Sequence, residues 1–304
     1  MRRGLNPYKK AKEIPAAPDV SLCIVTHFTN DAYHAGRAEI VLLCVSSMLR
    51  GMVGKSYELL IWDNGSTPEF ISMLQGLRPT VLVQSHNIGL HNAQNALAGL
   101  ARGKIISMCD DDILFAPDWF KQQHKVLTTY PKVGVVSGSP QRTAFRWAVS
   151  ANAKFAKSNT GVKREIGRLI PDKWERDYCL SVERDVHQHM TTTVLEQDTL
   201  IEYKGVKTWA HGHHMQFMGY RETVKKYLFQ TPYYLADGRK LNIDLDAAGF
   251  LNLTTFERTA VHIGNVIDDN IREIARNMGH EVTDAGNAIP DLHRPVVSFA
   301  SSGA

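Results

Sequence analysis

Between residues 20 and 138, five short apolar segments alternate with four segments of helical character. The expected strands are 20–26 (VSLCIVT), 57–62 (YELLIW), 80–85 (TVLVQS), 104–109 (KIISMC) and 133–138 (VGVVSG). Helices are expected over 36–51, 68–76, 89–102 and 117–130, with Gly103 in the usual C-terminal position of the third. Strands that are apolar on both faces and joined by helices are typical of a covered parallel sheet. The alternation therefore predicts an α/β fold with a Rossmann-like, mostly parallel sheet and helices on both faces.

Beyond residue 138 the regular alternation ends, and the sequence indicates a smaller mixed region. Residues 141–185 are basic and irregular, and residues 187–220 look β-rich because His and Thr alternate there. The remaining segments predict helices at 221–229, 238–248 and 267–278, with one or two strands in 250–265.

The composition is that of a folded chain without membrane-spanning segments. Hydrophobic residues make up 43% of the 304 residues, enough to bury a core. The longest uninterrupted apolar run, 40–45, is far shorter than the roughly 20 residues that span a bilayer. The first residues are basic but no apolar stretch follows them, so we expect no secretory signal. The four cysteines form no CxxC pair, which favours reduced core residues of a cytoplasmic protein.

The net charge of +4 comes from the N-terminal end of the chain. The first twelve residues hold five basic side chains and no acidic one, namely Arg2, Arg3, Lys9, Lys10 and Lys12. The rest of the chain has 30 basic and 31 acidic residues and is close to neutral. This distribution does not favour a nucleic-acid-binding surface on the folded body. It predicts a flexible basic tail over residues 1–18 that could touch an anionic membrane surface or an acidic acceptor.

Acidic residues gather at the carboxyl ends of two expected strands, where parallel sheets bind ligands. Asp63 follows the second strand, and Asp110, Asp111 and Asp112 follow the fourth. Adjacent carboxylates repel one another unless a positive group neutralises them, and a divalent cation with oxygen ligands would do so. The alternative is a solvated acidic turn in which Asp112 caps the next helix. Capping explains one of the three carboxylates but not all of them.

Three segments, in this order, resemble glycosyltransferases of family 2, which have the GT-A fold. They are VSLCIVTHFTN, ELLIWDNGSTPEF and HNIGLHNAQNALAGLARGKIISMCDDDILFAPDWF. They match the family's first strand, Asp-x-x-Ser turn, Asn-x-Gly helix and Asp-x-Asp segment over residues 20–140. Residues 216–265 match more weakly, and 141–215 have no counterpart. The resemblance implies a metal-dependent enzyme that moves a sugar from a nucleoside-diphosphate donor to an acceptor hydroxyl with inversion, using Mn²⁺ or Mg²⁺.

The resemblance also implies which residues hold the donor. Thr26 would contact the nucleotide, and Asp63 and Asn64 would hold its base. Many family members have Asp-Asp there, but the Asn64 amide oxygen could still accept from a uracil N–H, so a UDP-sugar is favoured. The start of the following helix, whose N–H groups favour phosphate, would supply Asn87, Gly89 and Asn92.

The Asp-x-Asp segment is the part of the resemblance that implies a metal. Asp110 would contact both the nucleotide and the metal, Asp111 would lie near the ribose, and Asp112 would be the main metal ligand. His262 matches a downstream His of the family, and is a third metal ligand, a phosphate contact or an ordinary strand residue. A divalent cation here would stabilise the charge that develops on the diphosphate leaving group.

An inverting transfer needs a general base that takes the proton of the acceptor hydroxyl. The family places it in an acidic motif before a helix, upstream of a Gly-aromatic pair. Gly249-Phe250 matches that pair and places the motif at Asp237-Gly238, with Gly in the usual base position. Asp237 is therefore the first candidate for the base and Asp244 the second. The alternative for Asp237 is an ordinary Asp-Gly turn before a helix.

Several histidines and tryptophans have an open role. On an expected strand, His211 and His213 would lie on one face and could bind a metal, or together with His214 they line an acceptor cleft or the surface. His187 and His189 show the same alternation and the same ambiguity. Three tryptophans could stack on an acceptor sugar or pack in the core: Trp147, Trp174 and Trp209.

Other nucleotide-binding classes lack their signatures in this chain. No GxGxxG follows the first strand, no GxxxxGK[ST] occurs, and no Gly-rich arginine loop of a sugar-1-phosphate nucleotidyltransferase is present. The alternative from a different class is a catalytically inactive nucleotide-sugar-binding or scaffold protein of the same fold, which Asn64 and Gly238 motivate.

The expected organisation has two folded halves between two tails. Residues 19–140 form a nucleotide-sugar-binding half, and residues 141–278 form the acceptor-side half of the same catalytic domain. Residues 1–18 are the basic tail, and residues 279–304 are a weakly ordered tail. Residues 141–220 would select the acceptor, and they match no known pattern. The acceptor is therefore open among a glycan, a lipid carrier, a protein and a nucleic acid.

Overall fold

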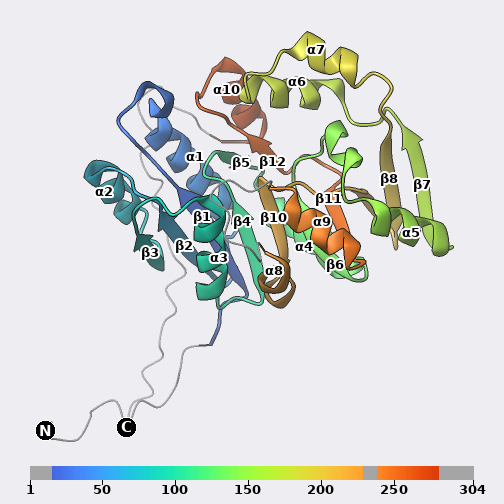
Figure 1. The fold of residues 1–304 in the computed structure, drawn as a ribbon, viewed down its shortest axis with the longest axis horizontal. Helices are drawn as coiled ribbons and strands as arrows, with labels where there is room; N and C mark the ends of the chain where they lie inside the picture. The colour runs from blue at the N-terminus through green and yellow to red at the C-terminus, as the bar shows by residue number, and fades with distance from the viewer. Residues whose placement is uncertain (1–15, 229–237, 281–304) are drawn as a thin grey trace, which may run out of the picture.

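A ten-stranded mixed sheet forms the centre of the computed structural model, which describes residues 16–228 and 238–280 (Figure 1). The strand order is β3-β2-β1-β4-β10-β6-β11-β9-β8-β7. The strands are β1 Val20–Thr26, β2 Tyr57–Asp63, β3 Val81–Gln84, β4 Ile105–Cys109, β6 Val133–Ser137, β7 Val162–Gly167, β8 Asp198–Tyr203, β9 Val206–Trp209, β10 Gln216–Tyr220 and β11 Leu251–Thr255. A separate small sheet pairs β5 Ile113–Phe115 with β12 Ala260–His262.

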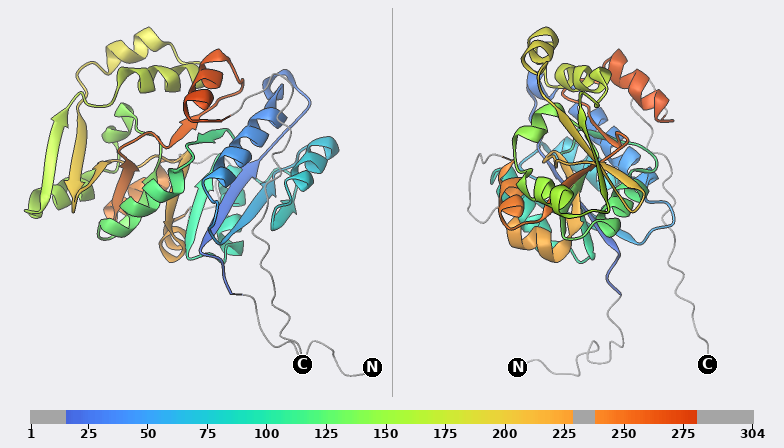
Figure 2. Two further views of the ribbon diagram at one scale, coloured as in Figure 1. Left: turned by 180° about the vertical axis from the view of Figure 1, so that it is seen from behind. Right: turned by 90° about the vertical axis from the view of Figure 1, so that its right-hand side faces the viewer.

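Helices cover both faces of the sheet, as predicted (Figure 2). On one face, Leu22 and Ile24 of β1 pack among side chains of α1, α2 and α4, while Cys23 and Val25 face α3, α8 and α9. The helices are α1 Arg37–Arg50, α2 Pro68–Gly76, α3 Leu90–Leu100, α4 Trp119–Thr129, α5 Ser150–Ser158, α6 Asp172–Ser181, α7 Val186–Thr192, α8 Arg221–Tyr227, α9 Lys240–Ala247 and α10 Asp269–Asn277. Short 3-10 helices span Ala32–His34 and Arg142–Arg146. Within the described ranges, no helix combines the length and the apolar character needed to cross a membrane.

The predicted strands run in the expected direction, but their neighbours differ in one place. β1, β2, β3 and β4 form parallel pairs. β10 lies antiparallel between β4 and β6, so β6 has the direction of β4 without touching it. Beyond β11, the remaining pairs are antiparallel. The two halves of the chain, before and after residue 140, therefore share one continuous sheet, because β10 and β11 of the second half pair with β4 and β6 of the first half. The four cysteines are free and buried, as expected.

Two expectations for the middle of the chain are wrong. Residues 141–185 are not irregular, because they hold α5, β7 and α6. Residues 186–192 form helix α7 and not a strand, and the carboxylate of Asp185 caps it by accepting from the backbone N–H of Gln188 (2.7 Å). His187 and His189 therefore do not share a strand face; His187 is exposed and His189 is buried. The capping bond from Asp185 favours a helix here, although the alternation of His and Thr is typical of a strand.

Gly103 does not end a helix, because α3 already ends at Leu100 with Ala101 as its C-cap. Instead, Gly103 packs against the start of β1, and its N–H donates to the Ser21 hydroxyl (2.8 Å). A Cβ atom at residue 103 would lie 2.5 Å from the backbone nitrogen of Ser21. The glycine is present because it allows this close approach to β1.

We expect Gly103→Ala to lower the free energy of unfolding by about 1–3 kcal/mol, because the added methyl group must displace the backbone of β1. The matched control is Gly99→Ala at the end of α3, where an added Cβ meets nothing within 4 Å. That control should raise stability by about 0.5–1 kcal/mol. Urea unfolding measures both variants. Equal effects of the two substitutions would contradict the packing role of Gly103.

Candidate active site

The carboxyl ends of β1, β2 and β4 bring three of the predicted donor-site residues together. Thr26 and Asp63 are direct partners in the parallel register of β1 and β2. The Thr26 hydroxyl donates to Asp111 Oδ2 over 2.6 Å, across the edge shared with β4. All three side chains are buried. The expectation that the acidic residues meet at one sheet edge is thus met for Asp63 and Asp111.

Arg37 supplies the positive charge that this acidic cluster needs, and the sequence analysis missed it. Its guanidinium bonds to Asp111 Oδ1 and, over 3.2 Å, to Asp112 Oδ2. Its side chain is largely buried. A signal was available, because Arg37 opens the helix that follows β1 and so lies at the same edge of the sheet.

The pairing of β5 with β12 places His262 beside Asp112. His262 pairs with Ile113 in the antiparallel ladder, and the N–H of Ile263 donates to the backbone oxygen of Asp112 (2.7 Å). His262 Nε2 lies 3.5 Å from Asp112 Oδ2. Its other nitrogen, Nδ1, makes a hydrogen bond of 2.9 Å with the Ser181 hydroxyl, which fixes the ring orientation. Two of the predicted metal ligands therefore face each other.

The residues present fit a divalent cation that is shared with a substrate. In the described part of the chain, no three His, Cys, Asp or Glu side chains are grouped closely enough to hold a metal ion alone. However, Asp112 Oδ1 is buried without a hydrogen-bond partner, and His262 Nε2 lies 3.5 Å from the other oxygen of that carboxylate, Oδ2. Mg²⁺ and Mn²⁺ sites of substrate-bound enzymes often combine one or two carboxylates with phosphate oxygens. Two facing protein ligands and an unpartnered carboxylate oxygen meet that requirement.

The loop between β3 and α3 is held by amide side chains. Asn64 Nδ2 donates to Asn87 Oδ1 (3.1 Å), and Asn64 Oδ1 accepts from the N–H of Ile88 (2.9 Å). Asn87 Oδ1 also accepts from the N–H of Gly89, whose φ of +84° suits glycine. Asn92 donates to the backbone oxygen of Ile88 (2.8 Å). These predicted donor residues thus form one network at the start of α3, and the Asn64 oxygen already accepts one hydrogen bond within it.

Asp110 turns to a small cavity of about 190 Å³ on the α3 side of the site. Burial raises the pKa of the Asp110 carboxyl well above its ordinary value, and the carboxylates of Asp112 and Asp111 raise it further. The cavity is also lined by His214 and Gly238, which touch closely. A Cβ atom at residue 238 would lie 2.5 Å from His214 Cδ2, so the imidazole occupies the space that a side chain there would need. The neighbouring Asp237 lies outside the described residues.

Asp244, the second candidate for the base, is absent from the lining of both cavities. Its carboxylate pairs with Lys240 one turn earlier in α9 (2.5 Å). Asn242 of the same helix lines the larger cavity, and two residues further along a helix corresponds to a rotation of about 200°. The structure therefore places Asp244 on the opposite side of α9 from the cavity.

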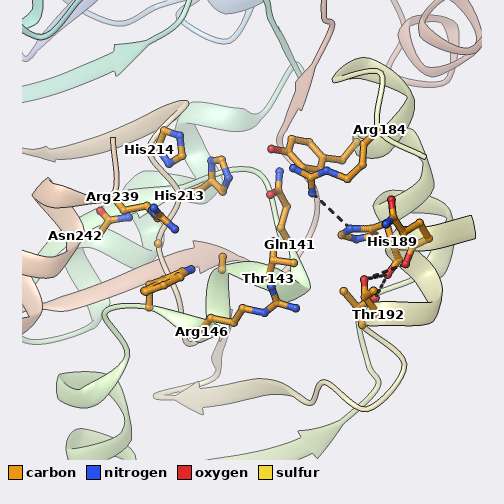
Figure 3. Close-up of a pocket in the computed structure, with 16 residues that line it drawn as sticks. Gln141, Thr143, Arg146, Arg184, His189, Thr192, His213, His214, Arg239 and Asn242 are labelled. Carbon is orange, nitrogen blue, oxygen red and sulfur yellow. Dashed lines mark hydrogen bonds between the residues drawn. The ribbon is translucent and has the colours of Figure 1, made fainter. Parts of the chain in front are cut away.

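A larger cavity of about 450 Å³ adjoins the site and is built mostly from residues 141–214 (Figure 3). His213 and His214 line it, and their rings stack at 4.7 Å. His211 is fully buried beneath them against the Phe145 ring, and burial lowers the pKa of His211 to about 3. His211 and His213 are thus neither strand neighbours nor surface residues, because they lie in the connection between β9 and β10.

The three tryptophans have different surroundings. Trp147 lines the larger cavity and keeps 46% of its surface exposed. Trp209 is buried and donates to the backbone oxygen of Phe256 (2.9 Å). Trp174 packs against the Arg258 guanidinium. Only Trp147 of these three has a position from which it can stack on a ligand in the cavity.

Comparison with protein families identifies the family of this chain. The family model described as Glycosyl transferase family 2 matches residues 23–179, which is more than half of the chain. No curated protein sequence matches the chain.

Two solved structures are similar to this chain over part of their length. A mannosyltransferase from Pyrobaculum calidifontis, in complex with GDP-Man and Mn²⁺, is 22% identical with a TM-score of 0.35, over 43% of this chain and 38% of that chain. Residues 1–349 of S. aureus TarS are 11% identical with a TM-score of 0.46, over 86% of this chain and 64% of that chain. The chain thus spans less than two thirds of either protein. The family match confirms the resemblance found in the sequence: the chain belongs to glycosyl transferase family 2.

Proposed function

We propose that the protein is a metal-dependent, inverting glycosyltransferase that uses a nucleoside-diphosphate sugar and an acceptor hydroxyl. The observation that carries this proposal is the buried cluster at the carboxyl edge of β1, β2 and β4. Thr26 and Asp111 are joined there, and Asp112 has one buried oxygen without a partner, Oδ1, while its other oxygen, Oδ2, faces His262. A buried carboxylate oxygen without a partner is costly, and a ligand that engages it removes that cost.

In this proposal Asp112 and His262 hold Mn²⁺ or Mg²⁺ together with the donor diphosphate. The cation, when bound, stabilises the negative charge on the leaving diphosphate. Ser181 orients His262 through Nδ1, so that Nε2 faces the carboxylate. Asp110 stays our proposal for a second contact to metal and nucleotide, from the side of the smaller cavity.

The nucleoside end of the donor would lie against Asp63 and the asparagine network. Asp63 Oδ2 accepts from the N–H of Ser66 (3.3 Å), whereas Asp63 Oδ1 is buried without a hydrogen-bond partner. This oxygen can accept from a base N–H, which keeps a UDP-sugar as the favoured donor. Asn87, Gly89 and Asn92 would border the phosphates at the start of α3.

The base that activates the acceptor is proposed to be Asp237, which precedes Gly238 at the edge of the smaller cavity. We propose a cytoplasmic enzyme whose basic N-terminal segment, outside the described residues, contacts an anionic membrane surface. Vesicles with and without anionic lipid, tested with the full chain and with a chain lacking residues 1–12, measure that contact.

A panel of nucleotide sugars tests the proposed activity. The protein is incubated with Mn²⁺ and each donor, and both the thermal shift and the release of free nucleoside diphosphate are measured. We expect one class of nucleotide to stabilise the protein and to be turned over. Tight binding without turnover for every donor and acceptor would instead favour the inactive scaffold that Gly238 suggests.

Removal of Arg37 tests the charge balance of the acidic cluster. We expect Arg37→Met to lower the melting temperature by several degrees in EDTA, because removing one partner of a buried ion pair typically costs about 3–5 kcal/mol. Mn²⁺ should restore more of this loss than it adds to the wild type, because it replaces the missing positive charge. Lys121→Met, on the exposed side of α4, is the control. A wild-type melting temperature in EDTA would contradict the role of Arg37.

A further inference from the structure

The larger cavity has a basic wall. Its lining includes three arginines, Arg146, Arg184 and Arg239, and no carboxylate side chain among its described residues. Arg146 is already neutralised, because its guanidinium pairs with Glu196. For Arg184, in contrast, no described carboxylate lies within ion-pair distance. The cavity therefore presents at least one cation, Arg184, whose charge no carboxylate of residues 16–228 or 238–280 balances through an ion pair.

Arg184 is held at this wall by a buried chain of hydrogen bonds. Glu175 Oε2 bonds to His189 Nε2 over 2.8 Å, and Glu175 Oε1 accepts from the backbone N–H of Arg142. His189 Nδ1 lies 3.5 Å from Arg184 Nη1. With Nε2–H donating to the buried carboxylate, Nδ1 is free of hydrogen and can accept from the guanidinium. The Tyr178 ring also contacts the guanidinium, at 5.6 Å.

This arrangement is that of a pre-organised anion-binding group. A guanidinium presents a planar set of donors that matches phosphate or carboxylate oxygens. Arg184 is exposed at the cavity, yet its position is fixed through two residues that are buried. An arginine that only contacts solvent needs no fixed partner. The buried Glu175–His189 pair behind Arg184 therefore indicates that the position of this guanidinium matters.

The opposite wall has groups that suit the rest of an acceptor (Figure 3). In that view Arg184 and His189 lie on one side of the cavity, and His214 and Arg239 lie on the other. The Arg239 guanidinium stacks on the exposed Trp147 ring at 4.5 Å. His214 lines both this cavity and the smaller one that holds Asp110, so it marks where the two cavities meet.

We infer that the acceptor carries a phosphate or carboxylate group, which Arg184 binds, while its reacting hydroxyl lies toward His214. The inference rests on the proposed glycosyltransferase function and adds the chemical class of the acceptor. The donor diphosphate does not explain the basic wall, because its proposed site is the Asp112 and α3 edge, outside the lining of this cavity.

The test compares glucose, glucose 6-phosphate and glucuronate as binding probes for the full chain. Binding is measured by saturation-transfer NMR with Mn²⁺ and saturating UDP present, so that the donor site is filled. We expect both anionic probes to bind about tenfold or more tightly than glucose, the gain typical of a charge-assisted hydrogen bond. Arg184→Gln should remove this preference, and Arg184→Lys should keep part of it.

The control is Arg164→Gln, which removes an equal charge from exposed β7, outside the cavity. It should leave the preference for anionic probes unchanged. Equal binding of all three probes, or an unchanged preference in Arg184→Gln, would overturn the inference. Nucleoside diphosphate release is measured on separate samples of the same protein preparations, which contain a nucleotide sugar and no added UDP, and it reports the proposed function separately. If no nucleoside diphosphate were released but the anionic probes still bound preferentially, the proposed glycosyltransferase function would be contradicted and the Arg184 site would not.

Discussion

Asp112→Asn is expected to reduce sugar transfer by about a thousandfold or more, because it weakens the main ligand of the proposed metal. The substitution keeps the size of the side chain but removes its charge. The two oxygens of Asp112 have different surroundings, since Oδ2 faces Arg37 and His262 while Oδ1 has no partner. An amide at this position offers only one oxygen and no charge to a cation. Donor turnover over a range of Mn²⁺ concentrations measures the effect.

The control for this substitution is Asp118→Asn at the start of α4, an exposed carboxylate that accepts from Gln122 in the same helix. It should leave turnover unchanged at every Mn²⁺ concentration. We also expect Asp112→Asn to abolish the stabilisation that Mn²⁺ gives in the presence of nucleotide. Wild-type turnover in Asp112→Asn at limiting Mn²⁺ would remove Asp112 from the metal site.

The first half of the fold could be predicted because its signals are local. Each strand from β1 to β4 is a short apolar run, and each helix between them has its own boundaries in the sequence. Carboxyl ends of neighbouring parallel strands meet at one edge, so the sequence could group Asp63 with the acidic cluster that contains Asp111, whereas Thr26 was assigned through the family resemblance. The insertion of β10 between β4 and β6 could not, because that pairing joins segments about a hundred residues apart.

The parts that sequence reasoning missed depend on contacts between distant segments. Arg37 reaches Asp111 across 74 residues, and its place at the start of the helix after β1 indicates the sheet edge but not the carboxylate that it meets there. Helix α7 lies where His and Thr alternate, and its packing rests on the His189–Glu175 pair. The basic cavity is built mostly from residues 141–214, where the sequence motifs offered no counterpart although the family model matches as far as residue 179, so its chemistry could be read only from the fold.

At Gly238, where the sequence departs from the family's acidic motif, the structure shows which side chain lies in the space beside the glycine. Where the family has an acidic residue, this chain has a glycine, and the His214 imidazole lies within 2.5 Å of where its Cβ would be. A larger residue at 238 would have to displace that ring. The His214 imidazole therefore fills the space beside Gly238, and the proposed base must come from a neighbouring position or from another side chain.

Asp237→Asn is expected to reduce transfer by about 10²–10⁴-fold while leaving metal-dependent nucleotide binding intact, because the amide cannot take the acceptor proton. Binding of UDP with Mn²⁺ is measured by thermal shift, and transfer is measured with the donor that the panel identifies. A loss of both would indicate a structural role for Asp237 and not the role of a base.

Two further variants separate Asp237 from its rivals. Asp244→Asn should leave transfer close to the wild-type rate, because Asp244 pairs with Lys240 on the side of α9 away from the cavity. His214→Asn tests the side chain that occupies the space beside Gly238. Unchanged transfer in Asp237→Asn would exclude Asp237. If His214→Asn then lost transfer but kept nucleotide binding, the base would be the His214 imidazole, which lies where the two cavities meet. If only Asp244→Asn lost transfer, helix α9 would have to turn when the acceptor binds.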